Sequence, residues 1–316
     1  MLKGASVFVH ARALDGLQRY GGGWRWEMPN GRTTAQAELL YFIRRDSTDL
    51  TYLLYPEQWE LDRTNGALDL SLRHRYFHDR GTGDLKLEMR SSAVGSAAGY
   101  GQVRLTAVNV NELGPIQVRT RGFGQYGTGA TPRESALYMA GASPEEMMEN
   151  KYVRSIGFVP YDWLGYSDGL NRFQQGGGLG LRGYAGYLAP EVDPSNGQTV
   201  FTHFGNTGLS ASAEIDLDGL VDWRPRNLAR YLHLDIYLFG DAGTMGYRNS
   251  RGHLELAPIR ADAGAGAAFT IKRFGPLVDI KPLTIRFDVP FLITALPATE
   301  QEHMAFRYVV GIGRNF

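Results

Sequence analysis

The sequence contains no cysteine, no excess of either charge and no long apolar run. Among 316 residues there are 33 basic and 33 acidic side chains. The lack of cysteine excludes structural disulfides, thiolate metal sites and a cysteine nucleophile. The balanced charge gives no support for a nucleic-acid partner, which calls for a basic excess on a domain or face. No stretch approaches the roughly 20 consecutive apolar residues of a membrane-spanning helix, so a helical membrane protein is excluded.

The beginning of the sequence also lacks a secretory signal. Residues 1–14 have neither an apolar core nor a small-residue cleavage site. We therefore expect either that a signal has been removed or that the chain is the C-terminal portion of a longer protein, and we favour the second.

The most regular feature that is present is the alternation of apolar and polar residues. A period of two is typical of a β-strand that presents one face to each environment. By itself the pattern predicts an antiparallel β protein, because a half-buried soluble sheet also alternates. The clearest segments are 68–73, 84–90, 209–218, 232–238 and 283–289.

Three further features favour a membrane barrel. The segments are near the roughly 9 to 11 residues of a tilted spanning strand. Short connections, expected at 45–48, 78–81 and 109–114, alternate with longer ones, and aromatic residues gather toward segment ends, as in an interfacial girdle: Tyr20, Trp24, Trp26, Tyr41 and Phe42. The predicted fold is an all-β, transmembrane antiparallel β-barrel. We expect about 12 strands, with 14 or 16 as alternatives.

The whole chain, 1–316, is expected to form this one barrel. Residues 1–126 supply seven or eight strands and residues 205–316 supply five. Between them, residues 127–204 form a long irregular segment with a short helical patch at 143–149. In a barrel such a loop folds into the lumen or caps it, whereas a structureless loop of this length is unusual in a compact soluble domain.

Two motifs in the second half carry a family resemblance. The long loop contains Gly-Gly-Gly-Leu-Gly-Leu-Arg-Gly-Tyr at 176–184, and a later strand ends in Phe-Gly-Asp-Ala-Gly at 239–243. Together they resemble the BamA-like barrel-assembly and two-partner-secretion superfamily (the bacterial surface antigen family). The resemblance covers residues 176–316, while the first half is similar only in its general pattern of alternating residues.

The resemblance implies that the loop folds back into the lumen and that Arg182 meets Asp241. The alternation independently turns Phe239 and Asp241 inward. An inward carboxylate is costly unless paired, and the arginine fork can bond both of its oxygens. Gly183 allows a sharp tip, Tyr184 is expected to pack on the inner wall, and Gly243 completes the strand motif. The alternative is a solvated turn with an unrelated arginine.

The last residues resemble the C-terminal β-signal of outer-membrane barrels. Such a strand is read by the assembly machinery and then closes against the first strand, which leaves no edge unpaired in lipid. The alternative is the last strand of a soluble sheet. The residues of this signal are Phe306, Tyr308, Val310, Gly311, Ile312 and the terminal Phe316.

No residues point to catalysis or to a cofactor. Residues 178–183 fit the Gly-x-Gly-x-x-Gly dinucleotide pattern, but the sequence that follows cannot start a stable helix. The inward charges are those expected of a watery lumen. The resemblance implies insertion of polypeptides into the bacterial outer membrane or their translocation across it, with lipid, client polypeptides and the assembly machinery as partners.

One departure from the family leaves other functions open. No periplasmic POTRA domains precede the barrel within these 316 residues. The alternatives are a passive small-solute pore, a membrane anchor for an enzyme or periplasmic domain encoded upstream, and a soluble β-sandwich or propeller.

Overall fold

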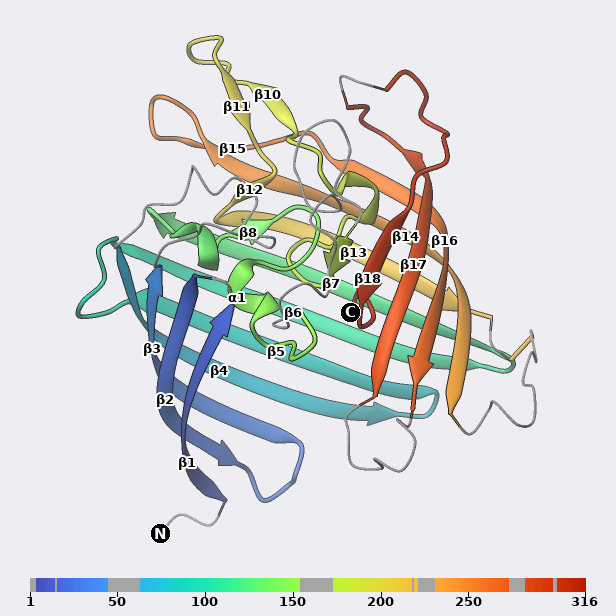
Figure 1. Cartoon of the computed structure of the whole chain (residues 1–316), viewed down its shortest axis with the longest axis horizontal. Helices are drawn as coiled ribbons and strands as arrows, with labels where there is room; N and C mark the ends of the chain where they lie inside the picture. Colours follow the sequence, from blue (N-terminus) through green and yellow to red (C-terminus); the bar gives the residue numbers. More distant parts are fainter. Residues whose placement is uncertain are drawn as a thin grey trace.

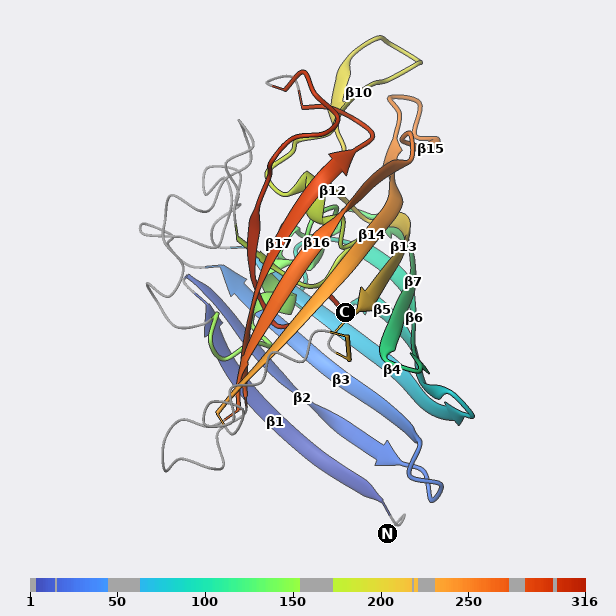
Figure 2. The same ribbon diagram turned by 90° about the vertical axis from the view of Figure 1, so that its right-hand side faces the viewer.

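A computed structural model describes most of the chain. The described residues are 4–14, 16–44, 63–153, 173–217, 219–220, 231–272, 282–297 and 300–316. They fold into one large, strongly curved antiparallel sheet with a long loop inside its curve (Figures 1 and 2).

Twelve strands of the described residues follow one another as antiparallel neighbours along this sheet, seven up to Gly129 and five from Thr207. Two short strands add to them: β15 (Leu254–Leu256) pairs with β14, and β9 (Phe173–Gln175) pairs with β18 in parallel. In order, the twelve are β1 (Ala5–Leu14), β2 (Leu17–Glu27), β3 (Thr33–Arg44), β4 (Thr64–His78), β5 (Gly81–Ser92), β6 (Tyr100–Leu113), β7 (Ile116–Gly129), β13 (Thr207–Asp216), β14 (Leu232–Arg248), β16 (Arg260–Ile271), β17 (Leu283–Ile293) and β18 (Val309–Ile312).

The alternating segments lie where the sequence predicts strands, in β4, β5, β13, β14 and β17. The expected turn at 78–81 joins β4 to β5, and the one expected at 45–48 lies outside the described residues. The turn expected at 109–114 is wrong in position. β6 stays paired with β7 as far as Leu113, and the chain reverses at Gly114, whose φ of 66° suits a tight turn better than a residue with a side chain.

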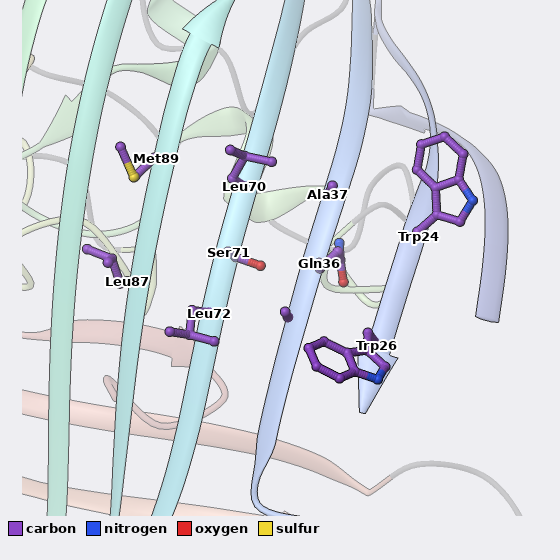
Figure 3. Close-up of a pocket in the computed structure, with 10 residues that line it drawn as sticks. Trp24, Trp26, Gln36, Ala37, Leu70, Ser71, Leu72, Leu87 and Met89 are labelled. Carbon is purple, nitrogen blue, oxygen red and sulfur yellow. The ribbon is translucent and has the colours of Figure 1, made fainter. Parts of the chain in front are cut away.

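The two faces of the sheet differ sharply in chemistry. On one face large apolar side chains are exposed, among them Val9 (84%), Trp24 (64%) and Leu39 (59%). On the other face, charged residues such as Glu38 and Asp69 are buried at 5% and 9% exposure. Figure 3 shows a shallow groove on the apolar face, lined on β2 to β5 by residues that include Trp24, Trp26, Ala37, Leu70, Leu72, Leu87 and Met89. The sheet is therefore apolar outside and charged inside.

The loop between β7 and β13, as far as the structure describes it (residues 130–153 and 173–206), lies largely against the charged face. It contains β8 (Leu137–Tyr138), α1 (Pro144–Met147), β9, β10 (Pro190–Val192), β11 (Thr199–Phe201) and β12 (Phe204–Gly205), and turns of 3-10 helix at Arg133–Ser135 and Arg182–Tyr184. Residues 133–148 and 173–184 are almost entirely buried. In Figure 1, α1 and β8 lie within the curve of the sheet, while the β10–β11 hairpin extends away from it. The helical patch predicted at 143–149 corresponds to α1, which begins with a capping box between Ser143 and Glu146.

The two edges of the sheet are β1 and the last strands (Figures 1 and 2). Pairings within the described residues join β1 to β2 and β18 to β17 and β9, but not β1 to β18. The expected closing pair is thus not observed. The predicted terminal strand is also shorter than expected, because Phe306 and Tyr308 lie before β18, which covers Val309–Ile312. After Ile312 the chain turns inward at Gly313, which has a φ of 78°.

Candidate loop–sheet lock

Arg182, at the tip of the loop, contacts carboxylates of two strands. Its Nε and Nη2 atoms donate to Oδ2 and Oδ1 of Asp241 on β14, at 2.7 and 3.0 Å. Its Nη1 atom donates to Oε1 of Glu214 on β13 at 2.8 Å. The side chains of all three residues are fully buried. Because charge-assisted bonds in a buried site are strong and their loss leaves charges unpaired, this contact holds the tip of the loop on the inner wall.

The environment of Arg182 reinforces this contact. Its Cζ atom lies 3.8 Å from the centre of the Phe239 ring, a close cation–π contact. Burial lowers the pKa of the guanidinium, but Asp241 and the other nearby carboxylates outweigh that effect and hold the pKa well above its ordinary value. Arg182 therefore remains charged in the docked loop.

Gly183 is needed for packing rather than for an unusual backbone angle. A Cβ atom at this position would lie 2.6 Å from Cγ2 of Ile293 and 2.7 Å from Cβ of Asp262. Both distances are far below a normal contact, so a side chain here would push the tip away from β16 and β17.

Tyr184 fastens the tip to the ends of two strands. Its hydroxyl donates to the carbonyl of Ala261 at 3.2 Å and accepts from the backbone N–H groups of Thr294 and Ala295 at 3.2 and 3.1 Å. The side chain is fully buried, as expected of a residue that packs on the inner wall.

Gly243 allows β13 and β14 to approach each other. A Cβ atom here would lie 2.7 Å from the carbonyl oxygen of Leu209 and 2.9 Å from Cβ of Ser210, its register partner. The three residues of the motif thus lie on the same side of β14. Phe239 places its ring against the Arg182 guanidinium, Asp241 supplies the carboxylate that pairs with it, and Gly243 allows the close approach of β13.

Sequence reasoning missed the residues that extend this ion-pair cluster. Glu214 accepts from Arg182 and also from Nη2 of Arg314 at 2.9 Å. On the next strands, Tyr237 donates to Asp288 at 2.6 Å, and Arg286 pairs with Asp288 and donates to Oε1 of Gln174 on β9 at 2.8 Å. The inward parity of β13 could have identified Glu214, but no local signal in the sequence places Arg314 in the interior.

The structure separates the residues of the expected C-terminal signal. Phe306 precedes β18 and is 69% exposed, while Tyr308 stacks with Phe287. Val310, Gly311 and Ile312 belong to β18, whose parallel partner is β9 of the loop. Beyond the strand the chain enters the interior, where Asn315 donates to the carbonyl of Gly180 at 3.1 Å. The last residues therefore contact the loop as well as the sheet.

A second set of ion pairs joins α1 to the opposite wall. Nη1 and Nη2 of Arg90 on β5 donate to both oxygens of Glu145, at 2.6 and 2.8 Å, and Nη1 of Arg104 on β6 donates to Glu146 at 2.7 Å. Glu149, just after α1, pairs with Arg12 of β1 and Arg19 of β2. Ion pairs between side chains thus join the loop to both halves of the sheet.

Neither a metal-ligand cluster nor a membrane-spanning helix is present among the described residues. No cluster of three or more His, Cys, Asp or Glu in this part of the chain is arranged to hold a metal ion. No helix in the same part is long and apolar enough to cross a membrane.

Known proteins resemble the chain in structure but not in sequence. No family model and no curated protein matches it. Among solved structures, BamA from Haemophilus ducreyi lacking POTRA domains 1–3 matches with a TM-score of 0.46 and 15% identity, over 98% of this chain and 59% of that one. CdiB from Acinetobacter baumannii matches with a TM-score of 0.48 and 14% identity, over 94% and 41%.

The chain spans 59% and 41% of the lengths of these two proteins. A likeness of this degree concerns the fold alone and says nothing about activity.

Proposed function

We propose that the chain is a plugged β-barrel of the bacterial outer membrane that inserts polypeptides into that membrane or translocates them across it. The plug is the described part of the loop between β7 and β13, residues 130–153 and 173–206, and the seam is the region between β1 and β18. The observation that carries the proposal is that β9, a segment of the plug, is paired with the last strand of the sheet.

The distribution of polarity supports a membrane setting. Exposed Leu68, Leu70 and Leu72 on β4 alternate with Asp69 and Ser71, which point toward the interior. A water-soluble protein has the opposite arrangement, because a contiguous apolar surface of this size favours aggregation. In an outer-membrane barrel an apolar belt faces lipid and a polar lumen faces water.

The strand edges at the seam are the reason to propose a polypeptide as the substrate. Unpaired backbone N–H and C=O groups cost several kcal/mol each in lipid, so a free strand edge there accepts another strand. Within the described residues, the edge of β18 is occupied by three residues of β9, Phe173–Gln175. Release of the plug would therefore free both the lumen and a strand-accepting edge in one step.

The way in which the plug is held supports its release. Ion pairs such as Arg182 with Asp241 and Arg90 with Glu145 fasten it to the sheet, and the sequence has no cysteine that could add a disulfide. A passive small-solute pore has no need of such a plug. An open pore would show a large, steady conductance with the loop in place.

A pair of engineered cysteines tests the proposal, and the lack of native cysteine makes the test clean. Phe173→Cys with Val310→Cys, which are register partners, would tie β9 to β18. The oxidised protein in proteoliposomes should fail to accelerate the insertion of an unfolded client barrel, and reduction should restore the acceleration.

The matched control is Ala35→Cys with Leu72→Cys, register partners on β3 and β4 that are remote from the plug. This pair should leave the insertion rate unchanged. Equal insertion by oxidised and reduced Phe173→Cys/Val310→Cys protein, with the cross-link verified, would contradict the proposal.

A further inference from the structure

The inner wall of β1 to β6 carries a group of arginines whose partners come from the plug. Arg12, Arg19, Arg90 and Arg104 lie on four different strands, and each contacts a glutamate of residues 145–149. We call these four residues the arginine wall. Their side chains are between 8% and 26% exposed, so water screens them only in part.

The sheet itself does not neutralise the arginine wall. Arg90 also bonds Asp69, at 2.9 Å, and Arg19 lies 3.6 Å from Glu38. A third nearby carboxylate, Glu88, is bonded by Lys86 at 2.7 Å and also interacts electrostatically with Arg104. If the three glutamates of the plug left, the four arginines and Lys86 would face three carboxylates, Glu38, Asp69 and Glu88, and this excess of positive charge in a confined space would attract an anion.

A cavity leads to the arginine wall from the rim where β2 turns into β3. Its volume is about 810 Å³, and its lining includes the wall together with Arg25, Arg32, Arg73 and Arg75. Arg73 and Arg75 are 48% and 60% exposed and share one carboxylate, Asp84, at 2.6 and 3.5 Å. An entering anion would thus meet accessible cations first and the arginine wall afterwards.

We infer that the arginine wall is a binding site for an acidic polypeptide segment, which α1 of the plug occupies in this structure. The present occupant identifies the ligand chemistry, because it is itself a short peptide whose carboxylates lie at positions 145, 146 and 149. Arg90 binds Glu145 with a two-pronged contact, which suits a planar carboxylate.

This inference rests on the proposed role in handling polypeptides and names the kind of segment that the lumen accepts. A client with an acidic segment would compete with α1 for the arginine wall and so help to displace the plug. A basic or neutral segment would gain nothing there.

The test uses the refolded full chain in detergent micelles and short labelled peptides rich in glutamate, glutamine or lysine. In the variant Glu145→Gln/Glu146→Gln/Glu149→Gln the plug no longer neutralises the wall. This triple variant should bind the glutamate peptide at least about tenfold more tightly than the parent does, a change worth about 1.4 kcal/mol. Adding Arg90→Gln and Arg104→Gln should abolish the gain, and raising the salt concentration should reduce it.

The matched control removes the same number of charges elsewhere. Glu191→Gln/Glu255→Gln/Glu300→Gln changes three glutamates that lie outside the cavity lining, and it should leave peptide affinity unchanged. If the triple variant does not fold, Arg182→Ala supplies a second route, because it loosens the plug from the opposite wall and keeps every arginine of the site.

Two outcomes would overturn the inference: equal affinity of parent and triple variant for the glutamate peptide, or binding of the glutamine or lysine peptide by the triple variant as tight as that of the glutamate peptide. In each case the cysteine cross-link experiment would still decide the insertion role by itself. Conversely, glutamate-peptide binding without any effect of the cross-link would keep the site and contradict the insertion role.

Discussion

Replacing Arg182 with alanine should undock the tip of the plug. The guanidinium makes three charge-assisted hydrogen bonds to Asp241 and Glu214, all within 3.0 Å, and the side chains are fully buried. Glu214 keeps Arg314 as a partner, whereas Asp241 loses its arginine. Removing one partner of a buried ion pair costs about 3–5 kcal/mol.

This free energy translates into a large change in the population of the undocked loop. At about 1.4 kcal/mol for each factor of ten, the undocked fraction should rise between about 10²- and 10⁴-fold. Hydrogen exchange and limited proteolysis across residues 176–189 measure this fraction directly, and the folded protein should lose its heat-resistant mobility on gels.

Two variants sharpen the interpretation. Arg248→Ala on the same strand as Asp241 is the matched control, because Arg248 donates to a backbone carbonyl, that of Gly252, rather than to a carboxylate. Arg182→Asp combined with Asp241→Arg should restore part of the protection, since the swap can rebuild the contact. Unchanged loop protection in Arg182→Ala, or no rescue by the swap, would refute the proposed lock.

Three other predictions concern the same loop. Gly183→Ala should destabilise loop docking by about 1–3 kcal/mol through overpacking against Ile293, while Gly122→Ala, where a Cβ atom meets nothing within 4 Å, should leave loop protection unchanged. Tyr184→Phe should cost about 1 kcal/mol, because it removes the acceptor of the Ala295 N–H, whereas the Thr294 N–H keeps the carbonyl of Ala261 at 2.9 Å. Thermal unfolding followed by gel mobility checks this, and a melting temperature equal to that of the parent would contradict it. Burial raises the pKa of Glu145, but Arg90 and the Ser135 hydroxyl outweigh burial and hold the pKa at about 2. Glu145 therefore stabilises the docking of α1 at pH values above its ordinary pKa of 4.5 and loses this effect as the pH falls from 4.5 toward 2. Protease protection of α1 should fall between these two pH values in the parent and stay constant in Glu145→Gln.

The strands were predictable from the sequence because each one separates two environments. Apolar residues such as Leu70 and charged residues such as Asp69 alternate over enough positions to fix both the strand and its orientation. The same alternation predicts that Asp241 points inward, and the Arg-Gly-Tyr motif suggests Arg182 as its partner. The residues on both sides of this contact could therefore be named before the structure was known.

The remainder depends on contacts between residues far apart in the sequence. Glu145 and Arg90 meet across the interior although neither segment carries a local signal for the other. The inward course of residues 313–316 is a further example, because it is set by the partners of Arg314 on β13 and β14. Alternation in the Phe306–Ile312 segment could not reveal those partners.

The most direct test of the plugged barrel is single-channel conductance in a planar bilayer, with the parent compared with a deletion of residues 176–184. The deletion removes Arg182 and Tyr184 together with the backbone that Arg121 bonds at Gly178. A plugged barrel should show a small, unsteady conductance in the parent that becomes large and steady in the deletion. A large, steady conductance in the parent, unchanged by the deletion, would contradict the account.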